Sequence, residues 1–321
     1  MKKLLALLLA CLLFCSLFAG CSSHKDPPPD TTGSKSDALF TEDPAADGVL
    51  RILMIGNSGC YYYTDELTGM LKAAGIEAEV CNLYYSGCSV KQHWTWLKDG
   101  SKPYEYYTKS TGGNAKKLDG FTIDGALADR NWDIVTLQQA FWPEMVGHLA
   151  DAKAVTLSYA TDIYNHIRSK LPRAQLMWHQ TWAYQVGFDW RGGRPSDQIT
   201  EDMKVLTVEK QTAFYEIIRN VSNSVCASNN VPYIPVSDAW QIARKHPAIG
   251  DVLCDKATGG DDLHDGDTGG GQYLNACVWF EFITGQSCVG NTFRPTTYEL
   301  SEEKVAALQA CAHEAVQNLK K

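Results

Sequence analysis

Two hydrophobic patterns alternate along the chain from about residue 50 to the C-terminus. Short apolar runs of the kind that form buried strands occur at 52–55, 77–83, 132–139, 174–181 and 232–236. Segments with a helical spacing of apolar residues occur at 63–74, 152–171, 207–228, 270–284 and 301–319. This alternation is typical of a mostly parallel sheet covered by helices on both faces. We therefore expect a three-layer α/β/α sandwich with a mostly parallel five-stranded sheet, in which the Lys-, Tyr- and Gly-rich segment 100–120 is an insertion.

The first predicted strand ends in a turn that carries a candidate nucleophile. Gly56 interrupts the apolar run, and Asn57 and Ser58 follow it before the first predicted helix. In open α/β sheets this edge binds ligands, and backbone N–H groups at the start of a helix favour an anion there. A serine at this point can attack a carbonyl while its own N–H holds the oxyanion. The same residues also suit an ordinary turn, and the Gly-x-Ser-x-Gly elbow of α/β-hydrolases is absent because Gly59 comes one place early.

The next two strands also end in residues of interest. Gly87 lies in the loop 84–96 after the second strand, where a glycine would let the backbone approach a ligand closely. The third strand ends in two adjacent amides, Gln138 and Gln139. Each feature also has a purely structural interpretation, because a glycine suits any turn and buried amides can anchor a loop by hydrogen bonds.

The second half of the predicted site lies in the glycine-bounded loop 259–271, GGDDLHDGDTGGG. Asp261 and His264 stand three residues apart in this loop. A carboxylate at that spacing can accept the Nδ1–H of His264 and fix its tautomer while Nε2 faces a nucleophile. Among the eight histidines the nearest rival is His93, in the Gly87 loop.

The acidic loop permits other interpretations. The pattern Asp265-x-Asp267-x-Gly269 matches part of a calcium loop, but it lacks the third ligand position and the closing Glu of an EF-hand. A zinc site would need a second histidine or a thiolate, and the loop has neither. Considered alone, the segment also suits a solvated acidic loop. We predict neither a metal ion nor an organic cofactor.

In their chain order these motifs resemble those of the SGNH/GDSL hydrolase superfamily. The resemblance runs from about residue 51 to 285 and rests on Gly56-Asn57-Ser58, on Gly87, on the polar pair that ends the third strand, and on Asp261-x-x-His264. Asp-Asp-Leu-His, followed by Gly-Gln-Tyr-Leu-Asn-Ala-Cys-Val-Trp-Phe, is similar to the last block of a bacterial SGNH-like lipoprotein esterase subgroup.

The resemblance implies a flavodoxin-like fold and ester hydrolysis through a serine. By position, Ser58 would be the nucleophile, His264 the general base and Asp261 its orienting residue. The N–H groups of Ser58 and Gly87 would hold the oxyanion. The first block reads Gly-Asn-Ser where the family has Gly-Asp-Ser, and the third lacks the asparagine that donates to the oxyanion. We expect the Gln138 amide to substitute, with Gln139 as second choice, since one lost donor costs roughly two to three orders of magnitude in rate.

The N-terminal segment has the features of a targeting sequence. Residues 1–21 combine two initial lysines, an apolar core too short to span a membrane and small residues before Cys21. The ending Leu-Phe-Ala-Gly-Cys resembles a bacterial lipobox, so we expect Cys21 to be lipidated, with an ordinary secretory signal as the alternative. Residues 22–48, with three consecutive prolines, predict a flexible tether, and residues 49–321 a single hydrolase domain.

Charge and cysteine content narrow the functional classes. The formal net charge of −8, without a basic stripe, argues against binding to nucleic acid. Eleven cysteines include two in the leader and Cys21, which leaves eight. An even number permits disulfides in an exported protein, but their pairing stays open. Cys277 and Cys311, on predicted helices, can equally be small core residues.

We therefore predict a membrane-anchored, extracytoplasmic serine esterase that removes O-acetyl or other short acyl groups from carbohydrate. Its partners would be an acylated carbohydrate, or another small ester, and the membrane through the lipid anchor. Asn57, Gln139 and Trp182 are expected to contact the substrate, because aromatic residues beside polar groups suit sugar rings.

Two alternatives stay open. A non-catalytic carbohydrate-binding lipoprotein would have no need of Ser58, His264 and Asp261 together. A lipase or lysophospholipase of the same fold would want an apolar lid or groove, whereas the segments 100–120 and 186–195 are polar and glycine-rich.

Overall fold

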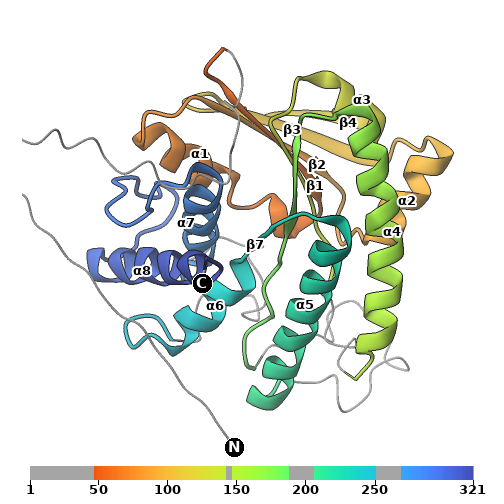
Figure 1. Cartoon of the computed structure of the whole chain (residues 1–321). Helices are drawn as coiled ribbons and strands as arrows, with labels where there is room; N and C mark the ends of the chain where they lie inside the picture. The colour runs from red at the N-terminus through yellow and green to blue at the C-terminus, as the bar shows by residue number, and fades with distance from the viewer. Residues whose placement is uncertain (1–46, 142–146, 188–205, 251–268, 321) are drawn as a thin grey trace, which may run out of the picture. The chain divides into compact units, whose positions relative to one another are not determined.

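The computed structural model describes residues 47–141, 147–187, 206–250 and 269–320 (Figure 1). All of them belong to one compact unit, which runs from Asp37 to Lys321. The predicted leader 1–21 and nearly all of the predicted tether 22–48 lie outside the described residues. Within the described ranges, none of the helices combines the length and the hydropathy needed to span a bilayer.

Five neighbouring strands of the sheet are parallel: β1 (Leu50–Gly56), β2 (Ala78–Tyr84), β5 (Ile134–Leu137), β6 (Gln175–His179) and β7 (Tyr233–Ile234). The strand order is β4-β3-β2-β1-β5-β6-β7, so the direction of winding reverses at β1. Open α/β sheets have a crevice at the carboxyl edge where the order reverses. The strand order therefore predicts a ligand site at the ends of β1, β2 and β5.

Alternate side chains of β1 enter two separate hydrophobic cores, one on each face of the sheet. Ile52 and Met54 pack with α1 (Thr64–Ala73), α6 (Val236–Lys245), α7 (Gly271–Thr284) and α8 (Glu302–Asn318). Leu53 and Ile55 pack with α2 (Val90–Asp99), α3 (Ile123–Asp129), α4 (Leu149–Lys170) and α5 (Val208–Asn229). Figure 1 shows α7 and α8 on one side of the sheet and α4 and α5 on the other. The predicted three-layer sandwich is confirmed.

The sheet has seven strands rather than the predicted five. The segment expected to be an insertion forms β3 (Tyr104–Ser110) and β4 (Lys116–Phe121), an antiparallel hairpin that extends the sheet beside β2. Tyr104 and Tyr106 of β3 are buried, whereas β4 is exposed along almost its whole length. Because β4 is held by backbone pairing rather than by apolar burial, its composition gave no sign of a strand.

One further local expectation was wrong. The predicted loop 84–96 contains most of α2, which begins with a capping box between Ser89 and Gln92.

After β7, Pro235 precedes α6, which begins at Val236. Asp238, in the first turn of α6, accepts hydrogen bonds from the hydroxyls of Tyr215 and Tyr233.

The described cysteines are all free thiols: Cys60, Cys81, Cys88, Cys226, Cys277, Cys288 and Cys311. Cys254 lies outside the described residues. Cys277 and Cys311 are buried in the core between α7 and α8, in keeping with their interpretation as small apolar residues.

Close packing of α1 against the C-terminal region predicts an unusual result for Gly69→Ala. Alanine normally stabilises a helix by about 1 kcal/mol relative to glycine. A Cβ at Gly69 would overlap the ring of Phe293, so we expect the change to lower the free energy of unfolding by about 1–3 kcal/mol in urea denaturation. Ala73→Gly, at the exposed last residue of the same helix, gives the effect of an Ala–Gly exchange without a packing contact. A gain of stability in Gly69→Ala would contradict the packing.

Candidate active site

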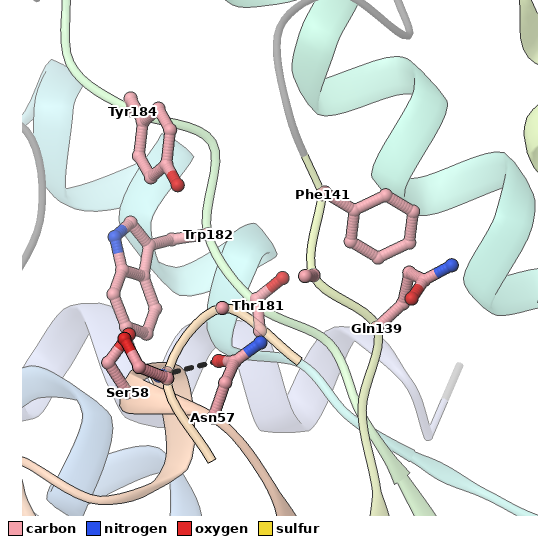
Figure 2. Close-up of a pocket in the computed structure, with 11 residues that line it drawn as sticks. Asn57, Ser58, Gln139, Phe141, Thr181, Trp182 and Tyr184 are labelled. Atoms are coloured by element: carbon pink, nitrogen blue, oxygen red, sulfur yellow. Dashed lines mark hydrogen bonds between the residues drawn. The ribbon is translucent and has the colours of Figure 1, made fainter. Parts of the chain in front are cut away.

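A pocket lies at the carboxyl edge of the sheet, where the winding reverses (Figure 2). Its volume, as bounded by described residues, is about 110 Å³. Four segments line it, one after each of β1, β2, β5 and β6, and they contribute Asn57, Ser58, Gly59, Ser86, Gly87, Gln139, Ala140, Phe141, Thr181, Trp182 and Tyr184. The structure therefore brings together five of the residues that the sequence singled out.

Ser58 is the first residue of a short 3₁₀-helix, η1 (Ser58–Cys60), which separates β1 from α1. Asn57 precedes it in extended conformation and caps it, because its Oδ1 accepts the N–H of Gly59 at 2.9 Å. The N–H of Cys60 donates to the carbonyl of Asn57. Two N–H groups of the turn are thus satisfied internally. That of Ser58 has no partner among the described residues.

Gly87 supplies a second backbone N–H at the same pocket. Its φ of 62° lies in the left-handed region that favours glycine, which accounts for the residue at this turn. Its N–H makes no hydrogen bond within the described ranges. Among the described residues, the N–H groups of Ser58 and Gly87 are therefore both uncommitted at this pocket.

The Asn57 carboxamide links the turn of Ser58 to the turn of Gly87 by hydrogen bonds. Its Nδ2 donates to the carbonyl of Cys88 at 3.0 Å, next to Gly87. Its Oδ1 accepts from Gly59 and also from Nε2 of Gln138. Asn57 is only 6% exposed. It lines the pocket, but its side-chain oxygen and nitrogen are hydrogen-bonded to other residues of the protein.

The two amides predicted at the end of the third strand are also committed to other parts of the chain. Gln138 is not among the residues that line the pocket; its Oε1 lies 3.0 Å from Nδ1 of His179. Gln139 does line the pocket, but its Oε1 accepts from Val90 N and its Nε2 donates to Thr156, both at 2.9 Å. These contacts favour the loop-anchor interpretation for both residues, and donation by Gln138 to an oxyanion stays a prediction.

Burial keeps the side chains beneath the pocket neutral. Desolvation raises the pKa of the Cys60 thiol far above its ordinary range, so this thiol is protonated and does not compete with Ser58 as a nucleophile. Desolvation also lowers the pKa of His179 to about 3. His93, the rival histidine, has a pKa lowered to about 3 for the same reason and bonds to Tyr104 inside the core.

The predicted partners of Ser58 lie outside the described residues. This is true of Asp261, His264 and nearly all of the acidic loop considered for calcium or zinc. Their predicted roles therefore stay predictions. Four residues in or beside the site were not predicted from the sequence: His179, Phe141, Thr181 and Tyr184. Each stands at the end of a predicted strand or just after one, and this position could have indicated that it lies near the site.

Comparison with known proteins gives the family. Residues 51–315 match the model of a domain of unknown function, DUF4886. The chain belongs to the DUF4886 family. A crystal structure of a DUF4886 family protein from Bacteroides uniformis is similar to it, with 28% identity, a TM-score of 0.69 and coverage of 85% of this chain and 96% of that one. The comparison with curated proteins found no match.

Two more distant structures were also found. Phospholipase A1 from Streptomyces albidoflavus is 13% identical, with a TM-score of 0.40 and coverage of 73% of this chain and 98% of that one. A family 3 carbohydrate esterase from Clostridium thermocellum is 11% identical, with a TM-score of 0.36 and coverage of 84% and 96% respectively.

The Asn57 contacts predict a stability effect that is separate from any activity. Asn57→Ala leaves Gly59 N–H, Gln138 Nε2 and the Cys88 carbonyl without their partner, so we expect the free energy of unfolding to fall by about 2–4 kcal/mol. Urea denaturation measures the loss. Asn114→Ala, at an exposed loop position, should change it by less than about 0.5 kcal/mol. Equal free energies of unfolding for the two variants would show that the hydrogen bonds of Asn57 contribute nothing to stability.

The buried histidines predict loss of stability in acid. The folded pKa values of His93 and His179, about 3, lie below the ordinary 6.5, so between these values the unfolded chain binds more protons and stability falls as the pH falls. Each histidine contributes a slope of about 1.4 kcal/mol per pH unit. We expect His93→Gln to reduce the slope of unfolding free energy against pH by that amount between pH 6 and 4. Asn114→Ala, at an exposed position and without any titratable group, should leave the slope unchanged.

Proposed function

We propose that this protein is an exported serine esterase that removes O-acetyl or other short acyl groups from carbohydrate. One observation carries the proposal: Ser58 and Gly87 line one pocket, and the N–H of each lacks a partner among the described residues. Backbone donors beside a serine hydroxyl at the carboxyl edge of a sheet are what acyl transfer requires. The motif resemblance to SGNH/GDSL hydrolases supports the same reaction.

The proposed reaction uses residues in the following roles. Ser58 Oγ attacks the ester carbonyl while His264, oriented by Asp261, takes the hydroxyl proton. The N–H groups of Ser58 and Gly87 hold the negative oxygen of the tetrahedral intermediate. The proton then passes to the departing alkoxide, and the acyl group stays on Ser58. Water, deprotonated by His264, hydrolyses this acyl-enzyme and restores the serine.

The size and lining of the pocket support a short acyl group. At about 110 Å³ it is smaller than a cavity of about 150 Å³ that accepts benzene in another protein. Trp182 lies beside Ser58, with Tyr184 beyond it and Phe141 on the opposite side (Figure 2). Flat aromatic groups next to open amide donors suit a sugar ring that carries a small ester.

Export and anchoring are part of the proposal. The leader 1–21 and Cys21 support lipidation, and the segment 22–48 would let the domain reach polymers outside the cytoplasm. The alternative of a carbohydrate-binding lipoprotein is favoured by one observation: within the described residues, neither Gln138 nor Gln139 faces the pocket with a free amide.

Hydrolysis of p-nitrophenyl esters from acetate to octanoate tests the function, using a protein that begins at Val49. We expect acetate to be the best substrate, and Ser58→Ala and His264→Ala to lower kcat by more than about a thousandfold. Equal rates for wild type and Ser58→Ala on every ester would favour the binding alternative. A rate that rises with chain length would favour a lipase.

Trp182 is expected to limit the length of the acyl group. Its ring stacks on the ring of Trp240, with the two ring centroids 5.1 Å apart, and forms one wall of the pocket. Trp182→Leu should raise the octanoate-to-acetate ratio of kcat/KM about tenfold, since it removes that wall. Trp240→Leu is the matched control, because it loses the same stacking without lining the pocket and should leave the ratio unchanged. Equal ratios in the two variants would contradict this role for Trp182.

A further inference from the structure

Gln138 and His179 form a buried hydrogen-bonded pair behind the Ser58 turn. Gln138 is 1% exposed and His179 is fully buried, and neither lines the pocket. We propose that the two are positioning residues, which hold the backbone donors of Ser58 and Gly87 in the geometry that an oxyanion needs. This inference rests on the proposed esterase function.

The orientation of every group in the pair follows from one backbone donor. The N–H of Gly59 can only donate, so the Asn57 atom that it meets is the carbonyl oxygen Oδ1. The Gln138 atom that meets the same oxygen must therefore be the amide nitrogen Nε2. The Gln138 oxygen then faces His179, so Nδ1 of His179 carries the proton and donates it at 3.0 Å.

The environment of His179 preserves that proton position. Its ring lies edge-on to the aromatic rings of Tyr63 and Trp279, with centroids 6.0 and 5.3 Å away. The low pKa of the buried imidazole keeps it neutral, which leaves a single N–H for Gln138. A neutral histidine with one proton on Nδ1 is a directional donor, and it fixes which way the Gln138 amide points.

The packing of the turn also depends on Gln138. A Cβ at Gly56 would lie 2.7 and 2.8 Å from Cγ and Cδ of Gln138, and one at Gly59 would lie 3.0 Å from its Nε2. The backbone on both sides of Ser58 therefore closes directly onto the glutamine side chain. A shift of the amide would shift the turn with it.

The pair acts on both donor turns through Asn57. Gln138 fixes Oδ1 of Asn57, and the same carboxamide donates from Nδ2 to the carbonyl of Cys88. The order of contacts is thus from His179 to Gln138, from Gln138 to Asn57, and from Asn57 to the turns of Ser58 and Gly87. Displacement of catalytic groups by about 1 Å can cost about a hundredfold in rate.

Steady-state kinetics on p-nitrophenyl acetate with the full chain tests the proposal. Gln138→Met keeps the volume of the side chain and removes its amide, so we expect kcat to fall about a hundredfold while KM changes less than about threefold. His179→Leu should behave in the same way. His179→Asn offers an N–H near the position of Nδ1 and should recover at least tenfold of the kcat that His179→Leu loses.

Gln309→Met is the matched control for a merely structural effect. Gln309 is a buried glutamine on α8, 4% exposed, and its amide bonds to Tyr273, Asn291 and Gly290. Gln309→Met should lower the free energy of unfolding and leave kcat unchanged. If Gln138→Met keeps wild-type kcat, or if His179→Asn is no better than His179→Leu, the positioning proposal is overturned.

A second measurement does not depend on hydrolysis. The ¹⁵N NMR shifts of labelled histidine should show His179 neutral with its proton on Nδ1, and Gln138→Met should perturb that signal. A proton on Nε2 would overturn the proposal even in an active enzyme. If the wild type hydrolyses no ester faster than Ser58→Ala, the proposed function fails, and the NMR result still decides whether the pair exists as described.

Discussion

The hydrogen bonds of the Asn57 carboxamide are the constraint on which the rest of the site depends. Parallel strands set their carboxyl ends about 4.8 Å apart, but the turns that follow are free to diverge. Asn57 joins three of these turns, because it accepts from Gly59 and Gln138 and donates to Cys88. A carboxylate could take over the two accepting contacts but not the donating one, since it has no N–H. The need for this N–H donor explains an asparagine at position 57, where the SGNH/GDSL motif that the sequence resembles has aspartate.

The described side chains beneath the Ser58 turn are buried and neutral. Cys60 and His179 are fully buried and held neutral by desolvation. Partial charges of backbone N–H groups act more strongly on a ligand oxygen in such a medium than in water, because the local dielectric constant is low. A charged side chain beneath Ser58 would compete with those dipoles. Neutral amides and a neutral imidazole order the turn without doing so.

Much of the fold follows from periodicity in the sequence. The five parallel strands and the helices α1, α4, α5, α7 and α8 follow from apolar patterns, because each buries one or two faces in a core. β4 does not, since its side chains stay exposed and only pairing with β3 fixes it. α2 was hidden within a presumed loop, although Val90, Trp94 and Leu97 have helical spacing.

Part of the candidate site could also be predicted from the sequence. Ser58 and Gly87 could be placed because they follow adjacent strands, and the sheet sets that adjacency. The partners of Gln138 could not, because Asn57 and His179 lie 81 and 41 residues away in the chain. An amide at a strand end indicates a hydrogen bond but not its recipient. His179 has no carboxylate at a suggestive spacing, so only the assembled sheet reveals its contact.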